Sequence, residues 1–226
     1  PSALYELQNA VIRTRVAMGK FSFRNNELDH TSTYGTIMIH TEDQPLSRAE
    51  LRTIMESTAR KCHLTVYGVG TGFTETGMDL GSGNFRVLEK PSVAMISGDG
   101  ISSSDAGEIW HMFDTRFGIP LTMFPASRLG NINLDRYNVL IVAGSPETDS
   151  QVIEKIRIWN RQGGTIIAYK GGNSWLNRNK LAEIEYIPTA ESKLKEGIYA
   201  NRSVNIQAQQ IPGSIFAARL DLTHPL

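Results

Sequence analysis

The sequence predicts an α/β protein whose larger part is a three-layer parallel sheet with helices on both faces. Strand-like runs alternate with helical stretches from Pro91 onward, which is the element order of parallel sheets. These runs are almost continuously apolar, as expected for strands buried on both faces. We expect parallel strands at Val93–Ile96, Val139–Val142 and Ile166–Tyr169. A chain of 226 residues is long enough to bury such a core.

The helices between these strands are predicted from apolar spacing and from residues typical of helix ends. A first helix is expected at residues 106–118, with Ser104 or Asp105 as its N-cap and Gly118 as its stop. Its apolar face would carry Ile109, Met112 and Phe113. A strand at residues 119–124 and a helix at residues 149–164 complete the alternation.

The first ninety residues are predicted to form a separate, small α/β segment, so the expected domains are 1–90 and 91–226. Helical spacing predicts a first helix that ends near Gly19. A strand at residues 34–40, a helix capped by Ser47 and Glu50, and a strand at residues 63–69 would follow. Strand, helix and strand within about 35 residues is the spacing of a parallel crossover unit.

Composition excludes several classes of partner. Lys and Arg together number 23, as do Asp and Glu, so no overall field would attract nucleic acid or an anionic membrane. No run of about 18 apolar residues is present, so no membrane span is expected. Cys62 is the single cysteine, which excludes an internal disulfide and leaves the compartment unknown. Because the chain opens inside a helical pattern, we expect it to be a piece of a longer protein.

The candidate chemistry lies in the turns that follow the predicted strands. Lys170 begins a Lys-Gly-Gly turn at the end of a strand, where many α/β enzymes present a nucleophile. Ser145 occupies the turn after the preceding strand, where open α/β sheets place their sites. Ser103, Ser104 and Asp105 precede a helix, where they would either bind an anion or simply cap the helix. The candidate ligand-binding residues are therefore Ser103, Ser104, Asp105, Ser145 and Lys170.

Other motifs have plainer explanations. Gly70 and Gly72 suggest a dinucleotide loop, but no helical pattern follows them, so a surface loop is expected. Cys62 and His63 are adjacent and would point to opposite sides of an extended strand, so they could not readily form a catalytic Cys-His pair. Cys62 is therefore expected to be a small, buried hydrophobic residue. The tryptophans are expected to be packing residues and not a carbohydrate-binding platform, although Trp175 at the turn could be either; they are Trp110, Trp159 and Trp175.

From Pro91 to Leu226 the sequence resembles a known family. The stretches "VAMISGDGISSSDAGEIWHMFDTRFGIPLTMF", "LDRYNVLIVAG", "IRIWNRQGGTIIAYKGGNSWL" and "IPGSIFAARLDLTHPL" look like the region after the peptidase domain in large bacterial zinc carboxypeptidase-like proteins. That region is similar to class I glutamine amidotransferases, whose fold is flavodoxin-like. Residues 35–90 resemble more loosely the segment that bridges the two domains in such proteins.

The resemblance implies a domain that has lost its catalytic residues. Lys170 stands where active members carry the nucleophilic cysteine, and His224 is the single histidine after it, without the His-x-Glu pair. The resemblance also implies zinc in a peptidase domain upstream of Pro1. In this chain the nearest match to a zinc-ligand motif is His40 in "HTED", and a polar residue at a strand end explains it more simply. The expected metal and cofactor content of this chain is therefore none.

The function that the resemblance implies is that of a non-catalytic accessory or interaction domain. Its expected partner is its own upstream peptidase domain, and a peptide, a glycan or another copy of the chain remains open. The resemblance further implies an exported parent, periplasmic or secreted. The alternative is a hydrolase or amidotransferase-like enzyme with an unrecognised site near Lys170 and Ser145.

Overall fold

The computed structural model describes residues 1–25, 28–186 and 217, and residues 1–183 belong to one compact unit. The last stretch that carries the resemblance, residues 211–226, lies outside the described residues apart from Ala217. Within the described part of the chain, no helix is long and apolar enough to cross a membrane.

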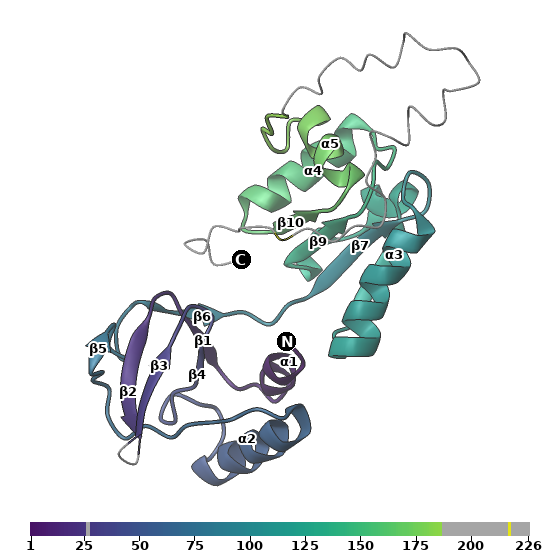
Figure 1. Ribbon diagram of the computed structural model, residues 1–226. Helices are drawn as coiled ribbons and strands as arrows, with labels where there is room; N and C mark the ends of the chain where they lie inside the picture. The colour runs from purple at the N-terminus through teal and green to yellow at the C-terminus, as the bar shows by residue number, and fades with distance from the viewer. Residues whose placement is uncertain (26–27, 187–216, 218–226) are drawn as a thin grey trace, which may run out of the picture. The chain divides into compact units, whose positions relative to one another are not determined.

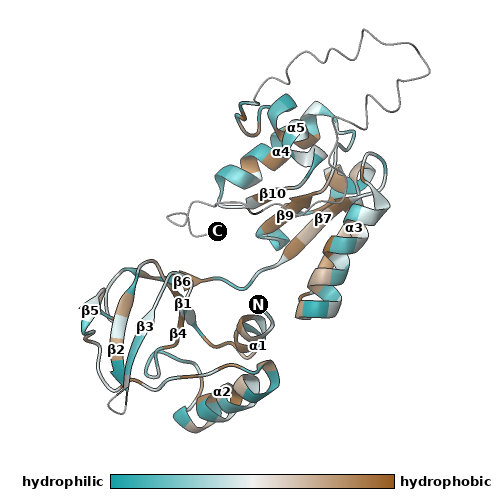
Figure 2. Ribbon diagram, in the orientation of Figure 1, coloured by the Kyte–Doolittle hydropathy of each residue, from teal (hydrophilic) through white to brown (hydrophobic). Residues whose placement is uncertain are grey.

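A four-stranded parallel sheet forms the core of the chain from residue 91 onward (Figure 1). Each neighbouring pair of strands is parallel, in the order β10-β9-β7-β8, which confirms the predicted parallel sheet. The hydrophobic colouring in Figure 2 gathers on β7 and β9, the two central strands. The strands span β7 (Val93–Ser97), β8 (Leu121–Pro125), β9 (Val139–Val142) and β10 (Thr165–Ala168).

Successive residues of β7 enter two different cores, so the sheet is covered on both faces. Ala94 and Ile96 pack with helix α4 (Ser150–Arg161) and helix α5 (Gly171–Arg178). Val93 and Met95 pack in a second cluster with helix α3 (Ser103–Trp110) and the π-helix His111–Phe117 that continues it. This alternation follows from the two-residue period of a strand and gives the expected three layers.

The helix ends were only partly predictable. Asp149 caps α4 through its side chain, which accepts a hydrogen bond from the Val152 amide at 2.7 Å. The predicted caps of α3 were wrong, because Ser102 is the N-cap and accepts from the Asp105 amide. Gly118 ends the helical stretch in a left-handed conformation, as predicted.

Two side chains of that stretch differ from expectation. Met112 is exposed, although it was expected on the apolar face of the helix. The chain widens into a π-helix at His111, so the spacing of an ideal α-helix no longer applies there. Trp110 is also exposed, whereas Trp159 and Trp175 are buried as predicted.

The first ninety residues contain two three-stranded antiparallel sheets, so the predicted parallel crossover unit was wrong. One sheet has the order β4-β1-β6 and the other β3-β2-β5. Aromatic side chains of β2 and β6, Phe21, Phe23 and Phe85, form a small core there. The strands span β1 (Thr14–Ala17), β2 (Phe21–Asn25), β3 (Leu28–Ser32), β4 (Ile37–Met38), β5 (Thr76–Gly77) and β6 (Phe85–Leu88).

The helices of this segment begin and end for local reasons. Helix α1 (Ser2–Asn9) stops well before Gly19, because β-branched residues follow and Thr14–Ala17 pairs as a strand with β4 and β6. Helix α2 (Arg48–Cys62) begins with the predicted capping box of Ser47 and Glu50. His63 ends α2 in a left-handed conformation, and residues 64–69 form no strand, contrary to prediction.

Candidate functional site

The chain turns sharply between β10 and α5, and Lys170 lies at this turn. Lys170 has φ 49° and ψ −117°, a combination outside the ordinary regions for a residue with a side chain. The Tyr169 amide donates to the Val142 carbonyl at 2.9 Å, and the Gly172 amide donates to the Tyr169 carbonyl at 2.9 Å. These bonds fix both sides of Lys170, so the strained backbone is held by its neighbours.

Close packing requires the second of the two glycines after Lys170 but not the first. A Cβ on Gly172 would lie 2.1 Å from the Val142 carbonyl oxygen, which no side chain tolerates. A Cβ on Gly171 would lie 3.5 Å from the Gly144 backbone, which is ordinary contact. Helix α5 therefore starts directly against the end of β9, and the missing side chain of Gly172 permits this approach.

The Lys170 side chain forms an ion pair with Asp105. Its Nζ lies 2.5 Å from Asp105 Oδ1; the carboxylate side chain is 11% exposed and the lysine side chain 53%. The hydrogen bond that the Lys170 ammonium donates to Asp105 raises the pKa of Lys170; desolvation lowers this pKa by less, and the nearby charges of Asp105, Tyr169 and Glu108 raise it slightly further. The ammonium also lies 5.4 Å from the centre of the Tyr169 ring. Lys170 is therefore a protonated cation at neutral pH.

Ser145 lies close to this turn but has a different partner. Its hydroxyl accepts a hydrogen bond from Arg178 of α5 at 2.7 Å, and its amide donates to the Gly100 carbonyl at 2.9 Å. An arginine donates hydrogen bonds and does not remove a proton, so this contact does not activate the serine. A Cβ on Gly144 would lie 2.4 Å from the Gly100 carbonyl oxygen, so the backbones of the loops after β7 and β9 are in close contact there.

The five candidate residues are thus divided between separate contacts. Asp105 and Lys170 meet, and Ser145 lies near the backbone of Gly171. Ser103 lines a groove on another side of α3, and Ser104 is exposed. Arg178 and Tyr169 belong to this region as well, although sequence reasoning did not single them out. Arg178 lies at the end of α5, and the direction of this helix brings its guanidinium to the Ser145 hydroxyl.

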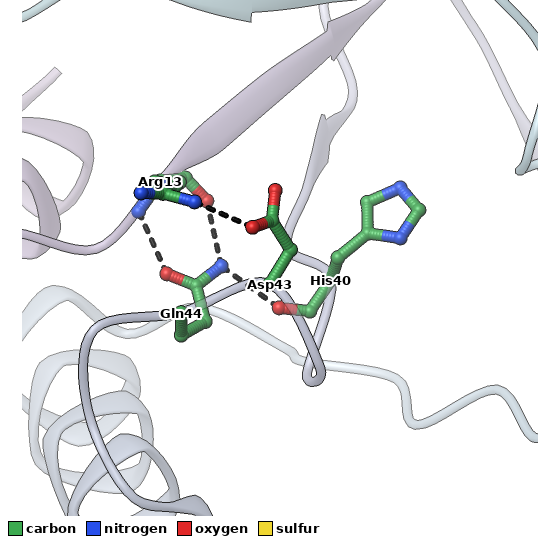
Figure 3. A network of polar contacts seen from close by, with 4 residues as sticks. All are labelled: Arg13, His40, Asp43 and Gln44. Atoms are coloured by element: carbon green, nitrogen blue, oxygen red, sulfur yellow. Dashed lines mark hydrogen bonds and ion pairs between the residues drawn. The ribbon is translucent and has the colours of Figure 1, made fainter.

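The other residues weighed from the sequence lie elsewhere. In Figure 3 the ring of His40 points away from Arg13, Asp43 and Gln44, and only its backbone carbonyl joins their network. Gln44 Oε1 accepts from the Arg13 amide at 2.8 Å, which ties this loop to the residue before β1. Cys62 is half-buried, and Gly70 and Gly72 lie in an irregular loop.

Within the described ranges, no three His, Cys, Asp or Glu side chains gather as a metal-binding group. In comparisons with known proteins, no family model, no curated protein and no solved structure matches this chain.

Proposed function

We propose that this chain is a non-catalytic accessory or interaction domain of class I glutamine amidotransferase-like, flavodoxin-like type. The observation that carries the proposal is the strained turn at Lys170, whose ammonium is bound to Asp105. The four-stranded parallel sheet with helices on both faces is compatible with this fold.

The chemistry of the turn argues against catalysis there. A nucleophilic or basic amine needs a lone pair, and the ion pair with Asp105 keeps Lys170 protonated by raising its pKa. A catalytic lysine instead requires a depressed pKa, produced by burial or a neighbouring cation. The Lys170 side chain is half exposed and its partner is an anion, so both influences are opposite to what catalysis needs.

The parent protein is proposed from sequence resemblance. We infer a zinc carboxypeptidase-like peptidase domain upstream of Pro1, with the zinc bound there and not by this chain. The accessory domain would pack against that peptidase domain, bind a peptide or glycan, or stabilise an oligomer.

One observation favours the alternative of an enzyme with a site near Lys170 and Ser145. Strained backbone is concentrated at functional sites, and Lys170 is strained at the end of a strand. In an enzyme, however, Ser145 would need a base that takes its proton, and Lys170 would need a lowered pKa. Their partners are Asp105, which holds the lysine charged, and Arg178, which donates to the serine.

Hydrolysis assays separate the two functions. We expect neither ammonia release from glutamine nor hydrolysis of an activated ester above background for the wild type, Lys170→Ala or Ser145→Ala. Lys20→Ala provides a matched control, because Lys20 is an exposed lysine outside this site. Turnover that is lost in Lys170→Ala or Ser145→Ala but kept in Lys20→Ala would establish the enzyme and overturn the proposal.

A further inference from the structure

We propose that the groove between α3 and β8 binds an extended, uncharged peptide segment, which adds as a strand beside β8. The proposal rests on the proposed function in one respect, since it takes the chain as an interaction domain and names its ligand class. The groove lies within residues 97–123, and Lys170 does not line it.

The groove is open and apolar, with a volume of about 390 Å³. None of the side chains that line it is ionisable, so a charged ligand group would be desolvated there without a partner. An uncharged ligand avoids this cost. The lining residues are Ser97, Gly98, Ile101, Ser103, Ala106, Gly107, Trp110 and Met123.

Helix α3 presents one stripe of residues to the groove. Ser103, Ala106, Gly107 and Trp110 recur at helical spacing, so they lie on one face. Three of them are small, and a Cβ built on Gly107 would meet no atom within 4 Å. The space beside the helix is therefore open, and a ligand side chain can enter it.

Exposed apolar side chains border this space. Trp110 is 40% exposed and Met123 of β8 is 45% exposed. The π-helix begins at His111, directly after Trp110, and π-helical segments occur frequently at functional sites. Burying the two side chains against an apolar ligand residue would contribute favourably to binding.

Strand β8 supplies the backbone half of the interaction. Among the described strands it pairs with β7 alone, at one end of the sheet order. Since no other described strand pairs with it, the backbone N–H and C=O groups on its other side can pair with an added strand, whereas a helix has already used its own. Thr122 and Met123 are both exposed although they point to opposite faces, as expected for a strand at an edge. The ligand is therefore extended, with backbone groups for β8 and an apolar side chain for the groove.

Peptide binding to the whole chain tests this inference. The probe is a capped, fluorescently labelled peptide of about six residues with alternating leucine and threonine, a typical strand length. We expect saturable binding by fluorescence polarisation and a change in Trp110 emission. A matched peptide with alternate amides N-methylated should bind about tenfold more weakly or worse, because it cannot pair with β8.

The variant Gly107→Leu tests whether the peptide occupies the groove. The side chain would fill the groove, and replacing a helical glycine should not lower thermal stability. We expect it to weaken peptide binding about tenfold while Ile158→Ala, which truncates an exposed apolar residue of α4, leaves binding unchanged. Absence of binding by the wild type, or binding that N-methylation or Gly107→Leu leaves unaffected, would overturn the inference.

The result is distinguishable from that of the hydrolysis assays. Turnover that depends on Lys170 would overturn the non-catalytic function. It would not decide whether the peptide binds, because the fluorescence titration measures binding separately. Failure of the peptide to bind would remove this ligand class and leave the assignment of the Lys170 turn intact.

Discussion

Lys170 and Asp105 lie 65 positions apart in the chain, and their side chains meet at 2.5 Å between Nζ and Oδ1. The contact joins the turn after β10 to the first turn of α3. Asp105 is buried while the lysine stem remains half exposed. The ammonium therefore acts as the partner of a buried carboxylate, at the turn that follows a strand of the parallel sheet.

The ion pair predicts a loss of stability at high pH. Because the folded-state pKa of Lys170 is raised by Asp105, its contribution is complete below the unfolded-state pKa of about 10.4 and is lost as pH rises through the folded-state value. The difference in unfolding free energy between wild type and Lys170→Met should therefore shrink above about pH 10.4. Denaturant melts from about pH 8 to pH 12 measure it. A difference that stays constant over this range would contradict the assignment.

The strained backbone predicts an inverted ranking of alanine and glycine at position 170. Both substitutions remove the ion pair, but only glycine adopts the positive φ without strain. We expect Lys170→Gly to be more stable than Lys170→Ala by about 1 kcal/mol, although glycine is usually the less stable residue. Urea melts of the two variants test this ranking. Alanine as the more stable residue would show that the turn is not strained.

The two glycines after Lys170 predict very different costs. Gly172→Ala should destabilise the chain by about 2 kcal/mol or more, because its Cβ would meet the Val142 carbonyl. Gly171→Ala should have little effect, since the nearest atoms are at contact distance. Thermal or chemical denaturation of both variants compares them directly. Equal costs would place the start of α5 differently.

The N-cap of α3 gives a third matched pair. Ser102→Ala should lower the free energy of unfolding by about 1 kcal/mol, the usual cost of a lost cap. Ser104→Ala changes an exposed residue two positions further on and should have almost no effect on stability. A larger effect at Ser104 would support the cap position that the sequence first suggested.

The parallel sheet could be predicted because its strands are buried on both faces and read as continuous apolar runs, as at Val139–Val142. The turn at Lys170 was also visible, since a strand, two glycines and a helical pattern follow one another. Local chemistry sufficed at Ser47, where the capping partner lies three residues away.

Other features depend on contacts that sequence spacing does not reveal. Residues 14–17 were predicted as part of the first helix from the helical spacing of apolar residues before them, but their pairing with β4 and β6 makes them a strand. To predict the ion pair of Lys170 with Asp105, one would have to know which loops meet at the end of the sheet. Trp110 is exposed and lines the groove, and neither this groove nor the π-helix after Trp110 has a sequence signature.

The protonation state of Lys170 tests the central claim most directly. In protein labelled at the lysine ε-carbons, the Lys170 resonance can be assigned by its absence from Lys170→Arg and followed by NMR as pH is raised. The ion pair with Asp105 predicts a midpoint above the ordinary value of about 10.4, and a lower midpoint in Asp105→Asn. A midpoint of about 7 to 8, the range of a catalytic lysine, would contradict the account.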